Sequence, residues 1–273
     1  MYTANEYRIV SSPEEAAELL NKSKRNRIIG GGMWMRLGKA SYGSLIDISR
    51  LGLDKIEVFD NEIRLGAMVT LRDIEVNETL KGEFCGALSN CVRDIVGTQF
   101  RNMATLGGSV FLRAGFSDIV CVLLALDAEV VRFGKEPVAL EEYLAAPRER
   151  ELITHIVIKR SGQTVRYESL RQSRTDFPLI NLCIAAYEPV NAADSQKTDS
   201  EKKLYRVCVG ARPGKAVRCK TAEECLANND LDGAVKAVQT LNFSSNMRGS
   251  AGYRKQMAGV LLKRAYECPV NNA

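Results

Sequence analysis

The order of apolar and polar residues predicts a chain that mixes short strands with helices. In the first third, the apolar runs Tyr7–Val10, Arg27–Ile29 and Leu45–Ile48 are short and bounded by turn residues, which favours strands. Between the first two runs, Ser12 and Pro13 precede two acidic residues, an arrangement typical of a helix N-terminus. The chain therefore begins strand, helix, strand.

The middle third continues this alternation. The run 119–126 is apolar on nearly all sides, which predicts a buried helix, whereas 97–112 shows no helical period. The other expected elements are a hairpin of 56–59 and 63–65, helices over 71–77 and 84–95, and strands over 129–133 and 152–158.

The last third changes character, with three strands followed by helices. The segment 191–203 is polar and charged, and we expect an exposed hairpin loop there. The expected strands are 165–169, 180–187 and 205–209, and the expected helices are 222–228, 231–241 and 250–267. We divide the chain into domains at 1–65, 66–162 and 163–273.

Composition and charge narrow the functional classes. The chain has 273 residues and a formal net charge of +5, with basic and acidic residues interleaved, so we expect no nucleic-acid partner. No apolar run approaches the roughly 18 residues of a membrane span. The N-terminus lacks the basic and apolar regions of a signal peptide, so we expect a cytoplasmic protein without a membrane partner.

The cysteines indicate no metal site. None forms Cys-x-x-Cys, and the one histidine, His155, lies in an apolar run. We therefore expect buried or surface thiols in a reducing compartment. The eight cysteines are Cys85, Cys91, Cys121, Cys183, Cys208, Cys219, Cys225 and Cys268.

Two glycine-rich segments carry the candidate chemistry. Gly30–Gly32 directly follow a predicted strand, so their backbone can turn tightly and bring N–H groups to an anion such as pyrophosphate, or simply make a turn. They form neither a Rossmann fingerprint nor a Walker P-loop. The second segment, Gln99–Ser109, supplies a cation, two amides, hydroxyl groups and the pair Gly107–Gly108. Together the two segments could hold one diphosphate from two sides.

The second segment also carries a resemblance to a known family. The run Gln99–Gly108 closely resembles the signature of the FAD-binding subunit of the molybdenum hydroxylases, which include xanthine dehydrogenase and carbon monoxide dehydrogenase. The resemblance continues in 117–119, 123–130, 174–177 and 247–254. It implies an α+β fold: a two-subdomain FAD-binding region of the vanillyl-alcohol oxidase type, and a C-terminal domain with a three-stranded antiparallel sheet and helices.

The resemblance also implies cofactors and partners. This chain would bind FAD and receive electrons from two [2Fe–2S] clusters on a small subunit. A large subunit would hold molybdopterin and oxidise the substrate, for which we expect purines or other N-heterocycles. The electrons would pass to NAD or another acceptor. No catalytic side chain is expected, because the flavin carries out the redox chemistry.

Sixteen positions match cofactor-binding positions of the family. Segments 29–35 and 105–109 would form two FAD loops, Asp118 would contact the flavin nucleotide, Ile95 and Ile153 would pack on it, and Arg171 stands where relatives often have lysine. The set comprises Ile29, Gly30, Gly31, Gly32, Met33, Trp34, Met35, Ile95, Thr105, Leu106, Gly107, Gly108, Ser109, Asp118, Ile153 and Arg171.

The chain departs from the family at several of these places. Met33-Trp34 stands where relatives carry a small polar or acidic pair, Ser109 replaces asparagine, and 112–116 differs. These departures motivate an alternative, a flavin-free or weakly flavin-binding scaffold subunit of the same complex. Asp118 could instead cap the following helix, and Trp34 could stack on a ring or pack in an interface.

Overall fold

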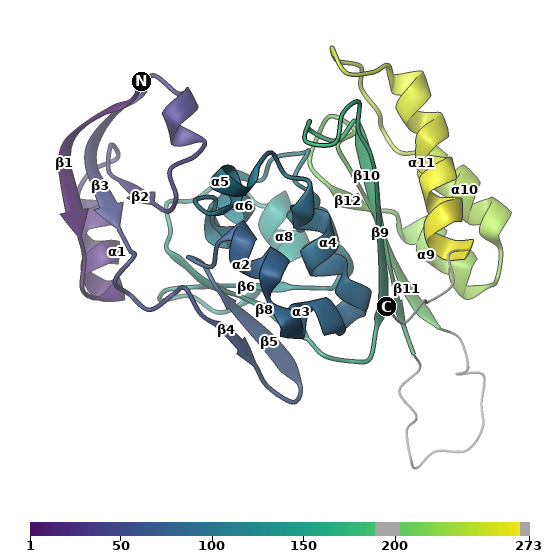
Figure 1. Cartoon of the computed structure of the whole chain (residues 1–273), viewed down its shortest axis with the longest axis horizontal. Coiled ribbons are helices and arrows are strands. Elements are labelled where there is room, and N and C mark those ends of the chain that lie inside the picture. The colour runs from purple at the N-terminus through teal and green to yellow at the C-terminus, as the bar shows by residue number, and fades with distance from the viewer. Residues whose placement is uncertain (189–202, 268–273) are drawn as a thin grey trace. The chain divides into compact units, whose positions relative to one another are not determined.

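The structure is a computed structural model that describes residues 1–188 and 203–267 (Figure 1). It separates into two compact units, which are described one at a time. Both units are discontinuous in sequence. Unit 1 comprises Met1–Ile74, Val96–Arg113 and Asp127–Lys159, and unit 2 comprises Glu75–Ile95, Ala114–Leu126 and the chain from Arg160 onward.

Unit 1 opens with a parallel sheet of three strands in the order β1-β3-β2. The helix between the first two strands begins as predicted: the Ser12 hydroxyl accepts a hydrogen bond from the Glu15 N–H, and proline stands in the first turn. Its Ala16 and Leu20 pack against Ile46 and Ile48 in a buried cluster. The elements are β1 (Thr3–Ile9), α1 (Pro13–Lys22), β2 (Arg27–Ile29), the 3₁₀ turn η1 (Met35–Leu37) and β3 (Ser41–Asp47).

A second sheet of unit 1 has five antiparallel strands in the order β4-β5-β8-β6-β7. The central strand is the apolar run around His155, which the sequence predicts as a strand. The strands are β4 (Ile56–Val58), β5 (Glu62–Gly66), β6 (Glu129–Arg132), β7 (Val138–Ala139) and β8 (Ile153–Lys159). The helices are α2 (Leu71–Val76), α5 (Thr98–Arg101), α6 (Leu106–Leu112) and α8 (Leu140–Ala145). The last two residues of α2 belong to unit 2.

Unit 2 contains an antiparallel sheet of four strands, so the prediction of three strands is wrong. The additional strand, β12, has two residues and pairs with Cys208 and Val209. A pair of residues gives no period from which a strand could be predicted. The sheet order is β12-β11-β10-β9, with β9 (Thr164–Leu170), β10 (Ile180–Tyr187), β11 (Leu204–Gly210) and β12 (Val217–Arg218).

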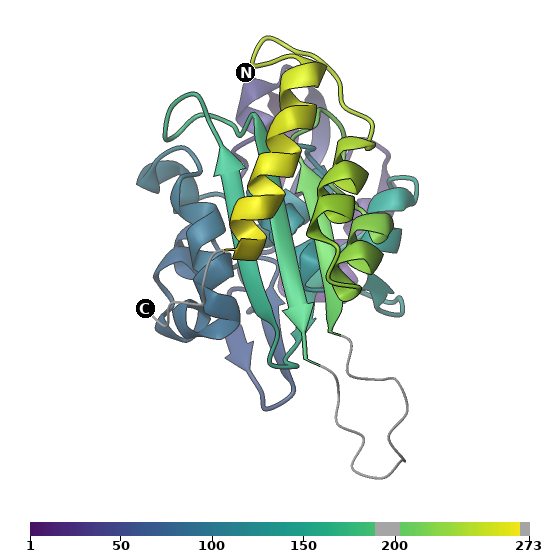
Figure 2. The same cartoon turned by 90° about the vertical axis from the view of Figure 1, so that its right-hand side faces the viewer.

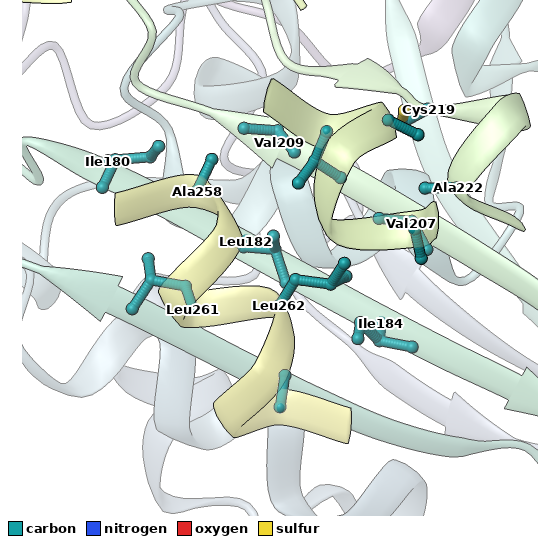
Figure 3. Packing of buried hydrophobic residues seen from close by; sticks show 14 of the residues in the cluster. Ile180, Leu182, Ile184, Val207, Val209, Cys219, Ala222, Ala258, Leu261 and Leu262 are labelled. Atoms are coloured by element: carbon teal, nitrogen blue, oxygen red, sulfur yellow. The ribbon is translucent and has the colours of Figure 1, made fainter. Parts of the chain in front are cut away.

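The sheet of unit 2 is buried on both faces. Ile180, Leu182 and Ile184 of β10 join a cluster formed with the C-terminal helices, while Asn181 and Cys183 face the other side. Figure 2 shows these helices, in yellow and yellow-green, across one face, and Figure 3 shows the packing. They are α9 (Lys220–Ala227), α10 (Leu231–Gln239) and α11 (Ala251–Glu267). On the other face lie η2 (Glu83–Gly86), α4 (Ala87–Arg93) and α7 (Asp118–Ala125), and α3 (Glu78–Gly82) packs against η2 and α4.

Two further predictions need correction. The segment 97–112 contains α5 and α6, because hydrogen bonds and the Thr105 cap support helices too short to show a period. The helix expected over 84–95 begins only at Ala87, since Phe84 and Cys85 have φ of +53° and +55°.

The expected loop 191–203 lies almost entirely outside the described residues. None of the helices in residues 1–188 and 203–267 combines the length and the hydrophobicity that a membrane span requires.

Candidate functional site

The first glycine segment makes a tight turn at the end of β2. Gly32 has φ +67°, a conformation that favours glycine, and a Cβ on Gly31 would lie 1.3 Å from the Met103 carbonyl oxygen. Glycine is therefore required here by the close approach of the second segment. Among the described residues, no acceptor bonds the N–H groups of Gly30, Gly31, Gly32 or Met33. This row of donors is available to a ligand.

The glycine pair of the second segment lies in the first turn of α6. Thr105 caps this helix, and its hydroxyl accepts from the Gly108 N–H at 3.3 Å. The Gly107 N–H donates to the Ala67 carbonyl at 2.8 Å, and the N–H groups of Leu106 and Ser109 are bonded as well. The segment thus contributes small residues and close packing, while the free backbone donors belong to the first segment.

The two segments border a cavity of about 360 Å³ that lies entirely within unit 1. Five of the predicted site residues line it: Gly30, Thr105, Gly107, Gly108 and Ile153. Eight other predicted residues of unit 1 do not line it: Ile29, Gly31, Gly32, Met33, Trp34, Met35, Leu106 and Ser109. Of these, Trp34 is exposed and Leu106 is fully buried.

Most of the cavity wall was not foreseen from the sequence. Its apolar part comes from residues that also belong to the neighbouring core, such as Leu20, Ile28 and Ile48. Its charged part comes from Arg27 and from the consecutive residues 148–151 of the segment between α8 and β8. The alternating charges Arg-Glu-Arg-Glu were the one signal that could have drawn attention to this segment. The remaining unforeseen lining residues are Ala67, Met68, Phe111 and Leu152.

The predicted site residues of unit 2 form a buried polar cluster. The Asp118 Oδ1 accepts from the Tyr167 hydroxyl, from Asn181 Nδ2 at 3.1 Å, and from Arg171 at 2.8 Å. Burial raises the pKa of the Asp118 carboxyl, and the charge of Arg171 opposes that rise. Arg171 also donates to the Asp176 carbonyl at 2.6 Å.

Two further features of unit 2 concern the N-cap of α7 and the position of Ile95. The N-cap of α7 is Ser117, whose hydroxyl accepts from the Val120 N–H, and Asp118 is the first helical residue. The capping alternative for Asp118 is therefore wrong. Ile95 follows α4 and donates its N–H to the Val92 carbonyl at 3.0 Å. Thus Ile95, Asp118 and Arg171 all belong to unit 2, whereas the glycine segments belong to unit 1.

The buried thiols of unit 2 lie close to this cluster. Cys121 donates to the Cys208 carbonyl at 3.6 Å, and Cys183 pairs with Cys208 in the sheet register. Burial raises the pKa of the Cys91, Cys121 and Cys183 thiols, which keeps them protonated. These cysteines are core thiols, as the sequence predicts. Cys268 lies outside the described residues.

Two family models match consecutive parts of the chain. Residues 3–160 match the FAD binding domain in molybdopterin dehydrogenase, and residues 166–268 match the CO dehydrogenase flavoprotein C-terminal domain. Together they cover nearly all of the chain.

Similar proteins are subunits of several oxidoreductases. The chain is 29% identical to the nicotine 6-hydroxylase medium subunit of Paenarthrobacter nicotinovorans, over 94% of each chain. It is 26% identical to the glyceraldehyde dehydrogenase medium chain of Sulfolobus acidocaldarius, over 94% of this chain and 95% of the relative. A solved structure of carbon monoxide dehydrogenase from Hydrogenophaga pseudoflava matches with a TM-score of 0.81 at 21% identity, over 96% of this chain and 95% of the other, which supports the fold.

Proposed function

Because the chain belongs to the family of FAD-binding subunits of the molybdenum hydroxylases, we propose that it passes electrons from [2Fe–2S] clusters to NAD⁺ through a bound FAD. The family and the α+β fold predicted from the sequence are confirmed by the matched domains, as is the class of FAD-dependent oxidoreductase subunit. The clusters, the molybdopterin and the acceptor belong to the proposal.

The observation that carries this proposal is the row of unbonded N–H groups beside the cavity. Gly30, Gly31 and Gly32 offer backbone donors with no side chains to keep a diphosphate away. Thr105, Gly107 and Gly108 provide a second wall without bulk. These residues would hold the diphosphate of FAD. When bound, FAD supplies chemistry that joins one-electron clusters to a two-electron acceptor.

For unit 2 we propose roles that follow from the polar cluster. The side-chain donors from Tyr167, Asn181 and Arg171 all meet at Asp118 Oδ1, which leaves Oδ2 without a donor from the described part of the chain. That oxygen is suited to accept from a hydroxyl of the flavin nucleotide. Since Arg171 is bound to Asp118, we propose that it orients this carboxylate. We assign Ile95 to packing against the same nucleotide.

We propose two partner subunits, a large one with molybdopterin and a small one with [2Fe–2S] clusters. The support is that similar proteins are named medium subunits or medium chains. For the substrate of the complex we propose an N-heterocycle, with purines as one class. The support is the similarity to the medium subunit of nicotine 6-hydroxylase, whose named substrate is an N-heterocycle.

Flavin content tests the core of the proposal. The full chain is purified, and its flavin absorbance and FAD stoichiometry are measured before and after incubation with FAD. We expect one tightly bound FAD per chain. A folded chain that neither retains nor takes up FAD would instead support the scaffold alternative, for which Met33-Trp34 is the motivating feature. Restoring small polar residues at these two positions would then be expected to restore uptake.

The electron acceptor needs a separate measurement. The FAD-loaded chain is mixed with NADH without oxygen, and bleaching of the flavin absorbance is followed. We expect bleaching, since hydride transfer is reversible. If dithionite bleaches the flavin and NADH does not, the NAD⁺ part of the proposal fails while FAD binding stands.

A further inference from the structure

The cavity of unit 1 is lined by glycines of both segments and by three arginines. Strand β2 runs from Arg27 to Ile29, so Arg27 lies about 10 Å along the strand from Gly30. The guanidinium of Arg27 turns back to the Lys24 and Asn26 carbonyls, away from the glycines. Arg150 reaches the same turn, where it donates to the Ser23 carbonyl at 2.5 Å.

Arg148 is anchored at a second place away from the glycines. It donates to the carbonyl of Leu112, the last residue of α6. Gly108 stands in the first turn of the same helix, about 6 Å away along the axis. Thus all three arginines that line the cavity are held at carbonyls outside the two glycine segments.

These guanidinium groups keep most of their hydrogen-bonding capacity. A guanidinium has five N–H donors, and the bonds to Lys24, Asn26, Ser23 and Leu112 occupy only one nitrogen of each arginine. Within the described residues, none of the three forms an ion pair with a carboxylate. Their charges and remaining donors are therefore available to a ligand.

The two acidic residues in the wall do not offset these charges. Glu151 lies 3.3 Å from Lys135 Nζ and 3.4 Å from Arg132, and Glu149 also pairs with Lys135. Lys135 and Arg132 do not line the cavity. Both carboxylates are thus paired with cations that do not line the cavity. The three arginines therefore give the cavity a positive charge.

The rest of the wall suits a flat ring. Leu20, Ile28, Ile48, Met68 and Leu152 give it an apolar surface. Ligand pockets have volumes of roughly 300–1,000 Å³. The cavity, at about 360 Å³, is near the lower limit of this range and therefore suits half of a dinucleotide. A redox-active ring must remain reachable by partners, whereas an adenine can be enclosed. Adenine also presents ring nitrogens as acceptors and a face on which guanidinium stacks.

We propose that Arg27, Arg148 and Arg150 bind the adenosine monophosphate half of FAD and determine the preference for FAD over FMN. This inference rests on the proposed function for the identity of the cofactor. The phosphate bridge lies at the glycine end, and the adenine lies between the apolar wall and the guanidinium groups.

The test compares two flavins in the same variants. Arg27→Gln, Arg148→Gln and Arg150→Gln are titrated with FAD and with FMN, and ADP is used as a competitor. Each substitution should weaken FAD on the order of tenfold, the effect of losing one charged hydrogen bond, and leave FMN unchanged. ADP should displace FAD from the wild-type chain. Unchanged FAD affinity in all three variants, or equal weakening of FAD and FMN, overturns the proposal.

Two controls separate this role from support of the fold. Arg25→Gln removes a neighbouring arginine that binds the Ser41 hydroxyl and does not line the cavity, and it should leave both flavins unaffected. Arg150→Lys keeps a donor for the Ser23 carbonyl, so its melting temperature should match the wild type. FAD should still weaken relative to FMN, because an ammonium replaces the planar fork. Wild-type FAD affinity in this variant excludes Arg150 from the proposed set.

A failure of the proposed function can be distinguished from a failure of this inference. If the wild-type chain takes up no FAD, the proposed function fails, and ADP binding is then measured directly by calorimetry in the wild type and the arginine variants. ADP that binds the wild type and is weakened by the three substitutions supports the arginine assignment. An absence of ADP binding overturns it.

Discussion

Two clusters of charged residues, one in each unit, differ in how their charges are compensated. In unit 2, the side chains of Arg171 and Asp118 are 8% and 4% exposed and compensate each other, with Tyr167 and Asn181 completing the cluster. In unit 1, Arg27 and Arg150 are half-buried and Arg148 is exposed, and within the described ranges their only partners are backbone carbonyls. We expect the compensated pair to contribute to the stability of the fold. We expect the uncompensated cations to contribute to ligand binding. The following predictions test this contrast, from the largest effect to the smallest.

Asp118→Ala should destabilise the protein most. It leaves the buried Arg171 without its counter-charge, which costs about 3–5 kcal/mol in the free energy of unfolding. Urea unfolding measures this loss. The matched control is Glu78→Ala, because the side chains of Glu78 and its partner Lys81 are 85% and 46% exposed, and an exposed pair contributes roughly 0–1 kcal/mol. Similar losses in both variants would contradict the contrast between compensated and solvated charges.

Gly31→Ala should affect both stability and ligand binding. The added Cβ would overlap the Met103 carbonyl oxygen, so the first segment must shift, at a cost of about 1–3 kcal/mol. The free N–H groups shift with it, and FAD affinity should fall by at least tenfold in a flavin titration. A folded variant with wild-type FAD affinity would show that these N–H groups do not hold the cofactor.

Gly252→Ala should stabilise the protein slightly. Gly252 lies in α11 of unit 2, has no positive φ, and nothing would contact an added Cβ within 4 Å. Alanine is therefore expected to raise the free energy of unfolding by about 0.5–1 kcal/mol. Gly134→Ala is the control: it also has open space but φ +70°, so it should destabilise. If Gly252→Ala lowers the free energy of unfolding, position 252 requires glycine for a reason that the described residues do not show.

Thiol labelling should reveal how closed the interior of unit 2 is. Cys85 is exposed, whereas Cys91, Cys121, Cys183 and Cys208 are buried with raised pKa values. Mass mapping after brief treatment with a thiol reagent at pH 8 should find Cys85 modified and the four buried thiols intact until denaturant is added. Rapid labelling of Cys121 would mean that the cluster around Asp118 opens readily.

The sequence predicts the long and buried elements well and the short ones poorly. Strand β10 was predicted because burial on both faces makes its apolar run nearly continuous. Strand β12 and helix α3 were missed because they are two and five residues long, and tertiary hydrogen bonds decide such elements. The break at Phe84 and Cys85 depends on left-handed φ values in residues that rarely adopt them, so no local pattern indicates it.

The candidate site was predictable only in part. The glycine motifs led to the family, but the sequence did not show that the N–H groups of the second segment are already bonded. That outcome depends on the Thr105 cap and on the Ala67 carbonyl, which lies far from Gly107 in sequence. The arginines were missed because the charged run 148–151 is typical of an exposed surface. Only the fold brings Arg150 to Ser23.

The division of unit 1 into three chain segments also affects how the protein is made. The residues that line the cavity extend from Leu20 to Ile153, and two stretches of unit 2 are translated between them. At ~5–20 residues per second, roughly 7–27 s pass between the emergence of the first and the last wall residue. A nascent chain therefore cannot acquire cofactor in this cavity early in synthesis. Insertion of the flavin must follow translation of more than half of the chain.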